Sequence, residues 1–173
     1  MSRIAALTPA TAQGAAQDML TELVAQHGQV GSMVSTMAHS PAVLGGYLQL
    51  SKAMKRAKLS RRISEVVSIA VQAQLGCRLC LNAHVAAART FGVTDAEIAA
   101  ARDGTSPDPA VAAMIATGLA IYSNPTTITD DQVAELRAFG YTDREIVDVV
   151  GVVALNVLTG AFNLVTGLRA EVT

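Results

Sequence analysis

Two cysteines and a histidine at helical spacing are the residues of this chain best suited to chemistry. Cys77 and Cys80 are separated by two residues, and His84 follows the second cysteine by four positions. Residues three and four apart share one face of a helix, so a helix here would align the two thiols and the imidazole. In a first helical turn the two Cα atoms lie about 5 to 6 Å apart, which permits a disulfide. The spacing therefore predicts a reversible thiol–disulfide pair.

A carboxylate can join these residues only if the chain reverses direction before them. Glu65 precedes Gly76, and Gly76 stands directly before the first cysteine. One unbroken helix, at about 1.5 Å per residue, would leave Glu65 about 22 Å from Cys80. A reversal at Gly76 would instead form an antiparallel helical hairpin, which we place at residues 59–91. We therefore expect a proton path in the order Glu65, His84, Cys80.

The environment of these groups bears on their chemistry. A glutamate on an amphipathic helix usually faces water, but apolar residues flank Glu65, and a partly buried carboxylate needs a partner. His84 is the candidate partner. A helix N-terminus and a nearby imidazole both lower a thiol pKa from about 8.5 towards 7, which favours a reactive Cys80.

A zinc site is the competing interpretation of the same residues. Cys77, Cys80 and His84 offer three ligands, with Glu65 as a fourth. Structural zinc sites prefer four Cys or His ligands, and the sequence holds no second cluster of them. We therefore expect neither a metal nor a cofactor.

The motif and its surroundings resemble one known family. A glutamate twelve positions before the first cysteine, the cysteine pair, and a histidine four positions after the second resemble the alkylhydroperoxidase D-like (AhpD-like) branch of the carboxymuconolactone decarboxylase-like family. The stretches Ser40–Leu44, Lys58–Arg62 and Glu65–Val71 are also similar to family members, so the resemblance covers most of the chain.

The resemblance implies an oligomeric, all-α thiol peroxidase, either a trimer or a hexamer built as a dimer of trimers. By position, Cys80 would be oxidised by the hydroperoxide, Cys77 would resolve the sulfenic acid, and Glu65 and His84 would form the proton relay. A dithiol or thioredoxin-like reductant would reopen the disulfide. The best-known peroxidases of the family carry a further histidine where Leu79 stands here. The decarboxylase branch lacks the cysteine pair, so lactone decarboxylation fits poorly.

Composition predicts one helical domain spanning residues 1–173. The chain is 51% hydrophobic but only 3% aromatic, so alanine, leucine and valine must fill the core, which favours closely packed helices over a sheet. No stretch alternates in the manner of a strand. We expect eight or nine helices in a compact bundle, with the hairpin at its centre.

Capping signals predict where these helices begin and end. The expected starts are Thr8-Pro9, for a helix ending near Gly28, and Ser40-Pro41, Ser106-Pro107 and Thr129 with Gln132. The sequence Phe91–Ile98 recurs almost unchanged as Phe139–Ile146. In each copy a glycine ends one helix, a threonine caps the next, and a glutamate completes a capping box.

The C-terminal stretch 139–168 is a possible degenerate repeat of the hairpin. Asp148 falls where Glu65 would fall, and with an offset of one residue Asn163 falls where Cys80 would fall. Val149–Leu168 also carries no charge over twenty residues, a length that can span a bilayer. It contains asparagines and glycines, however, and a helix apolar all round is more often buried in a core or between subunits. We expect no membrane insertion.

Charge and cysteine usage suggest the setting. The formal net charge is -1 and the sequence pI is about 6.3, which favours neither a nucleic-acid partner nor an anionic membrane. The first residues are too short for an export signal, and a close thiol pair without one suggests a reducing compartment. We expect a cytoplasmic protein.

Three functional hypotheses follow from the sequence. The first is a thiol-dependent peroxidase or disulfide oxidoreductase that uses Cys80 and Cys77. The second is a non-enzymatic redox sensor in which the same pair changes packing. The third is a Cys/His metal-binding module.

Overall fold

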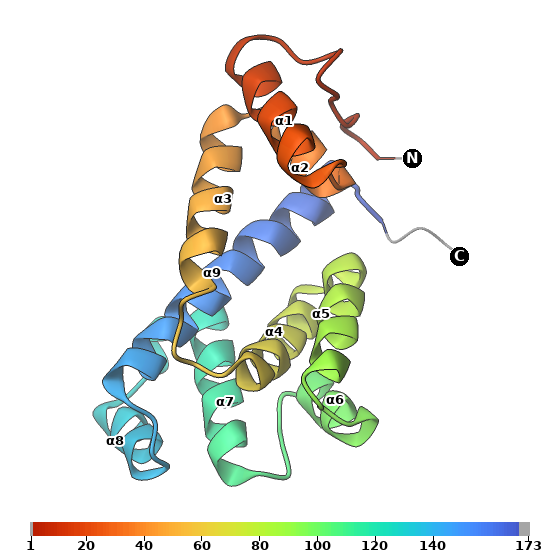
Figure 1. The fold of residues 1–173 in the computed structure, drawn as a ribbon. Coiled ribbons are helices and arrows are strands. Elements are labelled where there is room, and N and C mark those ends of the chain that lie inside the picture. Colours follow the sequence, from red (N-terminus) through yellow and green to blue (C-terminus); the bar gives the residue numbers. More distant parts are fainter. Residues whose placement is uncertain (1, 170–173) are drawn as a thin grey trace.

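The computed structural model describes residues 2–169, which form nine α-helices, one short 3-10 helix and no strand (Figure 1). In chain order the elements are α1 (Gly14–His27), α2 (Ser32–Met37), α3 (Pro41–Met54), α4 (Arg61–Leu75), α5 (Arg78–Thr90), α6 (Asp95–Arg102), α7 (Pro109–Ser123), the 3-10 helix (Pro125–Thr127), α8 (Asp130–Ala138) and α9 (Asp143–Thr166). The predicted all-α class is confirmed.

Helix α4 is the central element of the bundle. Nine consecutive residues, from Ser64 to Gln72, are buried, because α5, α6, α7 and α9 all pack around it. Gly118 lets α7 approach closely, since a Cβ at that position would lie 2.6 Å from Cγ1 of Val67. A polar or charged side chain on this stretch of α4 therefore sits inside the protein.

Helices α4 and α5 form the hairpin predicted at residues 59–91. Ser60 caps α4, its Oγ accepting a hydrogen bond from the N–H of Ile63 at 3.2 Å. Gly76 ends α4 with φ of 81°, a left-handed conformation that glycine adopts without steric cost. Only Cys77 separates Gly76 from the first residue of α5, so the chain reverses at once. The predicted reversal at Gly76 is confirmed.

Helix α9 occupies most of the stretch 139–168. It runs unbroken from Asp143 to Thr166, and the possible degenerate repeat in this stretch stays a prediction. Its inner glycines serve close packing: a Cβ on Gly151 would meet the side chain of Met54, and one on Gly160 would meet Leu75 and Gln72. By length and composition α9 could cross a membrane; in the structure one side of it packs against α3, α4 and α7, and 39% of its most apolar stretch is buried.

The N-terminal helices form a second hydrophobic cluster. Buried residues of α1, α2 and α3, among them Leu20, Met37 and Leu44, pack together, with Phe162 of α9 against them. Arg3 joins this region to the end of α9, because its backbone N–H donates to the carbonyl of Thr166 at 2.7 Å. In Figure 1 α1 and α2 lie near one end of α9, whereas α3 runs from them to the middle of α9.

Two predicted helix starts were wrong. Thr8-Pro9 forms a turn closed by the N–H of Ala12 on the carbonyl of Thr8, and α1 begins only at Gly14. Gly14 has φ of 55°, which separates the turn from the helix. Helix α7 begins two residues after Ser106-Pro107, because the carboxylate of Asp108 accepts from two backbone N–H groups and Pro109 follows it.

The remaining caps are as predicted. Ser40 caps α3, and Thr94, Thr129 and Thr142 each form a complete capping box.

Candidate active site

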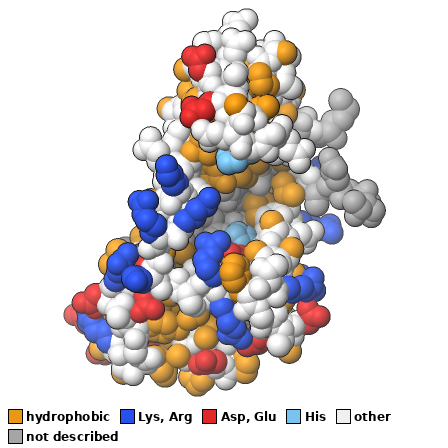
Figure 2. All heavy atoms as spheres, viewed as in Figure 1, with side chains coloured by type: hydrophobic (Ala, Val, Ile, Leu, Met, Phe, Trp, Pro, Cys, Tyr) orange, Lys and Arg blue, Asp and Glu red, His pale blue; other side chains and the backbone are white. Residues whose placement is uncertain are grey.

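A cavity of about 470 Å³ lies between the N-terminal cluster and the α4–α5 hairpin. Helices α2, α3, α4, α5 and α9 all contribute to its wall. Much of the lining is apolar and comes from Met33, Tyr47, Met54, Leu79 and Leu155. Figure 2 shows a hollow at this level, with a histidine side chain in it and Lys and Arg side chains along one side.

The two cysteines form a disulfide at the start of α5. Cys77 is the N-cap residue, and its Sγ accepts a hydrogen bond from the N–H of Cys80 at 3.3 Å. The Cα atoms are 5.4 Å apart, within the range expected for a disulfide. Both residues are buried, but of the two only Cys80 belongs to the described lining of the cavity. The two sulfurs are therefore unequal in access.

Glu65 and His84 make the contact that the sequence predicted. Oε2 of Glu65 lies 2.7 Å from Nδ1 of His84 across the hairpin. Glu65 is only 6% exposed, and its second oxygen lies 3.7 Å from a guanidinium nitrogen of Arg61. The carboxylate is thus held between two basic side chains. Glu65, His84 and Cys80 all line the cavity, which brings the three predicted residues to one wall.

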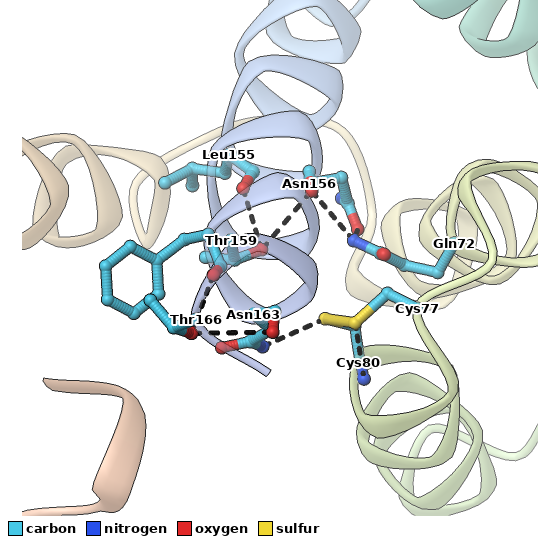
Figure 3. Close-up of a disulfide and its surroundings, with 9 residues drawn as sticks. Gln72, Cys77, Cys80, Leu155, Asn156, Thr159, Asn163 and Thr166 are labelled. Carbon is cyan, nitrogen blue, oxygen red and sulfur yellow. Dashed lines mark hydrogen bonds between the residues drawn. A yellow bond between two sulfur atoms is a disulfide. The ribbon is translucent and has the colours of Figure 1, made fainter. Parts of the chain in front are cut away.

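The helix α9 supplies a row of buried polar residues that the sequence analysis did not assign to the site. Nδ2 of Asn163 donates to Sγ of Cys80 at 3.2 Å, as Figure 3 shows. Two turns earlier on the same face of α9, Asn156 donates to Oγ of Ser68 and accepts from Nε2 of Gln72, both at 2.8 Å. The sequence did carry a signal, because the two asparagines are seven residues apart in an apolar helix and so share one face.

Asp148, the other residue of the expected repeat, lies at the entry to α4. Its Oδ2 accepts from the backbone N–H groups of Lys58 and Leu59, at 2.5 and 3.2 Å. It therefore fixes the segment that leads into the hairpin.

A second carboxylate fixes the hairpin from α6. Glu97 forms an ion pair with Arg62 and completes the capping box with Thr94. The hydrogen bond from the Thr94 backbone, followed by that from Arg62, lowers the pKa of Glu97 from 4.5 to about 2.

The side chains proposed as zinc ligands are not arranged as a metal site in this conformation. Between residues 2 and 169, no group of three or more His, Cys, Asp and Glu side chains is arranged to hold a metal ion. The two sulfurs are bonded to each other, and the carboxylate is engaged with His84.

Fold and site together define a class of protein: an all-helical domain with a C-x-x-C disulfide and a Glu–His pair on one cavity wall. Residues 41–123, which include this hairpin, match the carboxymuconolactone decarboxylase family. This match covers 83 of the 173 residues, so just under half of the chain is similar to that family. No protein of curated function matches the sequence.

Several solved structures share this fold. An AhpD-core, peroxidase-related protein from Ralstonia eutropha superposes with a TM-score of 0.83 at 20% identity, covering 99% of this chain and 93% of that one. A peroxidase-related protein from Silicibacter sp. gives 0.75 at 19% identity, covering 90% and 84%. The debrominase Bmp8, solved with 2,3,4-tribromopyrrole, gives 0.74 at 16% identity, covering 98% and 91%. At these identities the likeness shows the fold alone.

Proposed function

We propose that this protein is a thiol-dependent peroxidase that reduces hydroperoxides through Cys80 and Cys77. One observation carries the proposal: Cys80 shares a cavity wall with His84, which is hydrogen-bonded to the buried Glu65. A thiol, a base and a group that orients the base are the parts that an activated nucleophile requires. The resolving partner is also in place, because Cys77 is already bonded to Cys80.

The first step consumes the peroxide. In the reduced protein, His84 takes the proton of the Cys80 thiol, directly or through water, and the carboxylate of Glu65 stabilises the imidazolium that forms. The thiolate then attacks one oxygen of the O–O bond. That bond breaks, Cys80 becomes a sulfenic acid, and the departing alkoxide takes the proton back from His84 to leave as an alcohol.

The second and third steps restore the protein. The thiol of Cys77 attacks the Cys80 sulfenic acid, so that the disulfide forms and water leaves. An external dithiol then reduces the disulfide by exchange and is itself oxidised. Attack from the cavity reaches the sulfur of Cys80, and the leaving thiolate of Cys77 is stabilised by the N–H groups at the start of α5.

Turnover with a purified dithiol tests the proposal. Wild-type protein should consume cumene hydroperoxide continuously with dithiothreitol, and Cys80→Ser should abolish that consumption because serine forms no sulfenic acid. Cys77→Ser is the matched control, since its Cys80 should still be oxidised to the sulfenic acid by the peroxide. Unchanged turnover in Cys80→Ser would remove Cys80 from the mechanism.

The same experiment separates the peroxidase from the redox sensor. A sensor would consume one peroxide per protein in stopped-flow measurements and show no steady turnover with any dithiol. Stoichiometric zinc in elemental analysis of the reduced protein would instead favour the metal-binding module.

We further propose that the protein is a homo-oligomer that uses the outer face of α9. Exposed apolar residues recur along that face at alternating steps of three and four, the spacing of a helix–helix seam. They are Val147, Val150, Ala154, Val157, Ala161 and Leu164. We name them the α9 stripe. A second copy of the chain is the natural occupant, because two such stripes complement each other in a symmetric contact.

We place the protein in the cytoplasm, since the third step needs a compartment in which dithiols are kept reduced. Fractionation with an antibody against the native protein would test this.

A further inference from the structure

The hydrogen bond between Asn163 and Cys80 contributes little to the stability of the folded protein. Asn163 is 3% exposed, and its Oδ1 is buried without a hydrogen-bond partner among the described residues. Its Nδ2 donates to a sulfur, which in a thiol or disulfide is a weak acceptor. A buried amide with one unpaired oxygen and one weak bond destabilises the folded state.

Asn156 shows how the same helix satisfies a buried amide when packing is the purpose. Its Nδ2 donates to Oγ of Ser68 and to the carbonyl of Val152, and its Oδ1 accepts from Gln72. Asn156 and Asn163 are equally buried and both line the cavity. The two asparagines differ in their partners, because Asn163 donates to the sulfur of Cys80.

We propose that Asn163 is a further site residue, whose amide N–H stabilises the thiolate of Cys80 and holds its sulfur towards the cavity. A hydrogen bond to an ionised acceptor is about twice as strong as one between neutral groups, so this contact strengthens when Cys80 loses its proton. Unpaired buried polar atoms are tolerated at functional sites, where the group serves chemistry. The inference rests on the proposed role of Cys80 as the attacking thiol.

Close packing of α9 against α4 holds the side-chain amide of Asn163 next to Cys80. Gly160, one turn before Asn163, packs directly against the side chains of Leu75 and Gln72, since a Cβ there would overlap Cδ2 of Leu75 and lie 2.7 Å from Oε1 of Gln72. Beyond Asn163, α9 ends within one turn, at Gly167 with φ of 71°. Asn163 therefore faces Cys80 from a fixed backbone.

The pKa of Cys80 tests the inference directly. In a Cys77→Ser background Cys80 is the only thiol, and serine can still cap α5. Thiolate absorbance and iodoacetamide alkylation against pH then report Cys80 alone. Asn163→Leu should raise this pKa by about 1 to 2, lowering the alkylation rate at neutral pH about ten- to a hundredfold. Asn163→Asp should raise it further, because a carboxylate repels the thiolate.

Thermal midpoints distinguish this role from simple packing. Asn163→Leu should melt no lower than its parent, because leucine has similar volume and removes the unpaired oxygen. The matched control Asn156→Leu should melt lower, since it breaks bonds to Ser68 and Gln72, yet leave the pKa of Cys80 unchanged.

Two results would overturn the inference. One is a Cys80 pKa that stays at the parent value in both Asn163 variants. If Asn163→Leu does not fold, the pKa of Cys80 in Asn163→Asp alone decides. The other is an equal pKa rise in Asn156→Leu. The titration uses no peroxide, so a raised pKa without peroxide turnover would sink the proposed function and leave this inference standing.

Discussion

Replacing Glu65 by glutamine is the sharpest test of how the site moves its proton. Glutamine keeps the size and can keep a hydrogen bond to His84, but it removes the negative charge next to the ring. That charge matters when His84 has accepted the Cys80 proton and become an imidazolium. Glu65→Gln therefore removes an attraction present in the transition state and leaves the resting geometry nearly intact.

The size of the effect follows from the geometry. With about 4 Å between the charge centres and an effective dielectric constant of about 20, the attraction is about 4 kcal/mol. The His84 side chain is 28% exposed, so solvent reduces this to roughly half. A loss of about 2 kcal/mol lowers kcat/KM about thirtyfold.

The assay is steady-state reduction of cumene hydroperoxide with dithiothreitol, with folding checked by circular dichroism. Glu97→Gln is the matched control, because Glu97 also pairs with an arginine of α4 but is not part of the described cavity lining. A Glu65→Gln enzyme within threefold of wild type would refute the electrostatic reasoning. An equal loss in both variants would indicate general damage.

Three further predictions concern stability and assembly. Because the pKa of Glu97 is lowered from 4.5 to about 2, its ionised form stabilises the fold above about pH 4.5, and this contribution is lost as the pH falls through 2. In urea denaturation, the stability advantage of wild type over Glu97→Gln should therefore shrink between pH 6 and pH 3. A difference in stability that does not change with pH would contradict this prediction. Gly160→Ala should destabilise the fold by about 1 to 3 kcal/mol in chemical denaturation, because its Cβ would meet Leu75 and Gln72, whereas Gly46→Ala, where no atom lies within 4 Å, should not. Val157→Asp in the α9 stripe should shift the light-scattering mass to that of the monomer, whereas Ala134→Asp on exposed α8 should not; a monomeric wild type would contradict the oligomer.

Local signals made the hairpin readable from the sequence. The turn at Gly76 requires a positive φ, and the Thr-x-x-Glu boxes at Thr94 and Thr142 satisfy their own backbone groups. Features of this kind depend on a few neighbouring residues, so their types suffice to predict them. The contact of Glu65 with His84 followed because two helices joined by one residue have little freedom to separate.

Long-range contacts were beyond such reasoning. Two contacts of α9 depend on how this helix crosses the bundle. Asn163 donates to Cys80, 83 residues away, and Asp148 accepts from the backbone of the segment that leads into α4. The role of a glycine depends on its surroundings in the same way: Gly76 ends α4, whereas Gly160 lies within α9 and packs against Leu75 and Gln72. Nor could the sequence show which thiol faces the cavity, because access depends on all five helices that form the wall.

Trapping the sulfenic acid tests the central claim most directly. One equivalent of cumene hydroperoxide is mixed with reduced Cys77→Ser or Cys80→Ser protein in the presence of dimedone, and the adduct is located by mass spectrometry. We predict a stoichiometric adduct on Cys80 in Cys77→Ser protein and none in Cys80→Ser protein. An adduct on Cys77 in Cys80→Ser protein, together with an unmodified Cys80 in Cys77→Ser protein, would contradict the account.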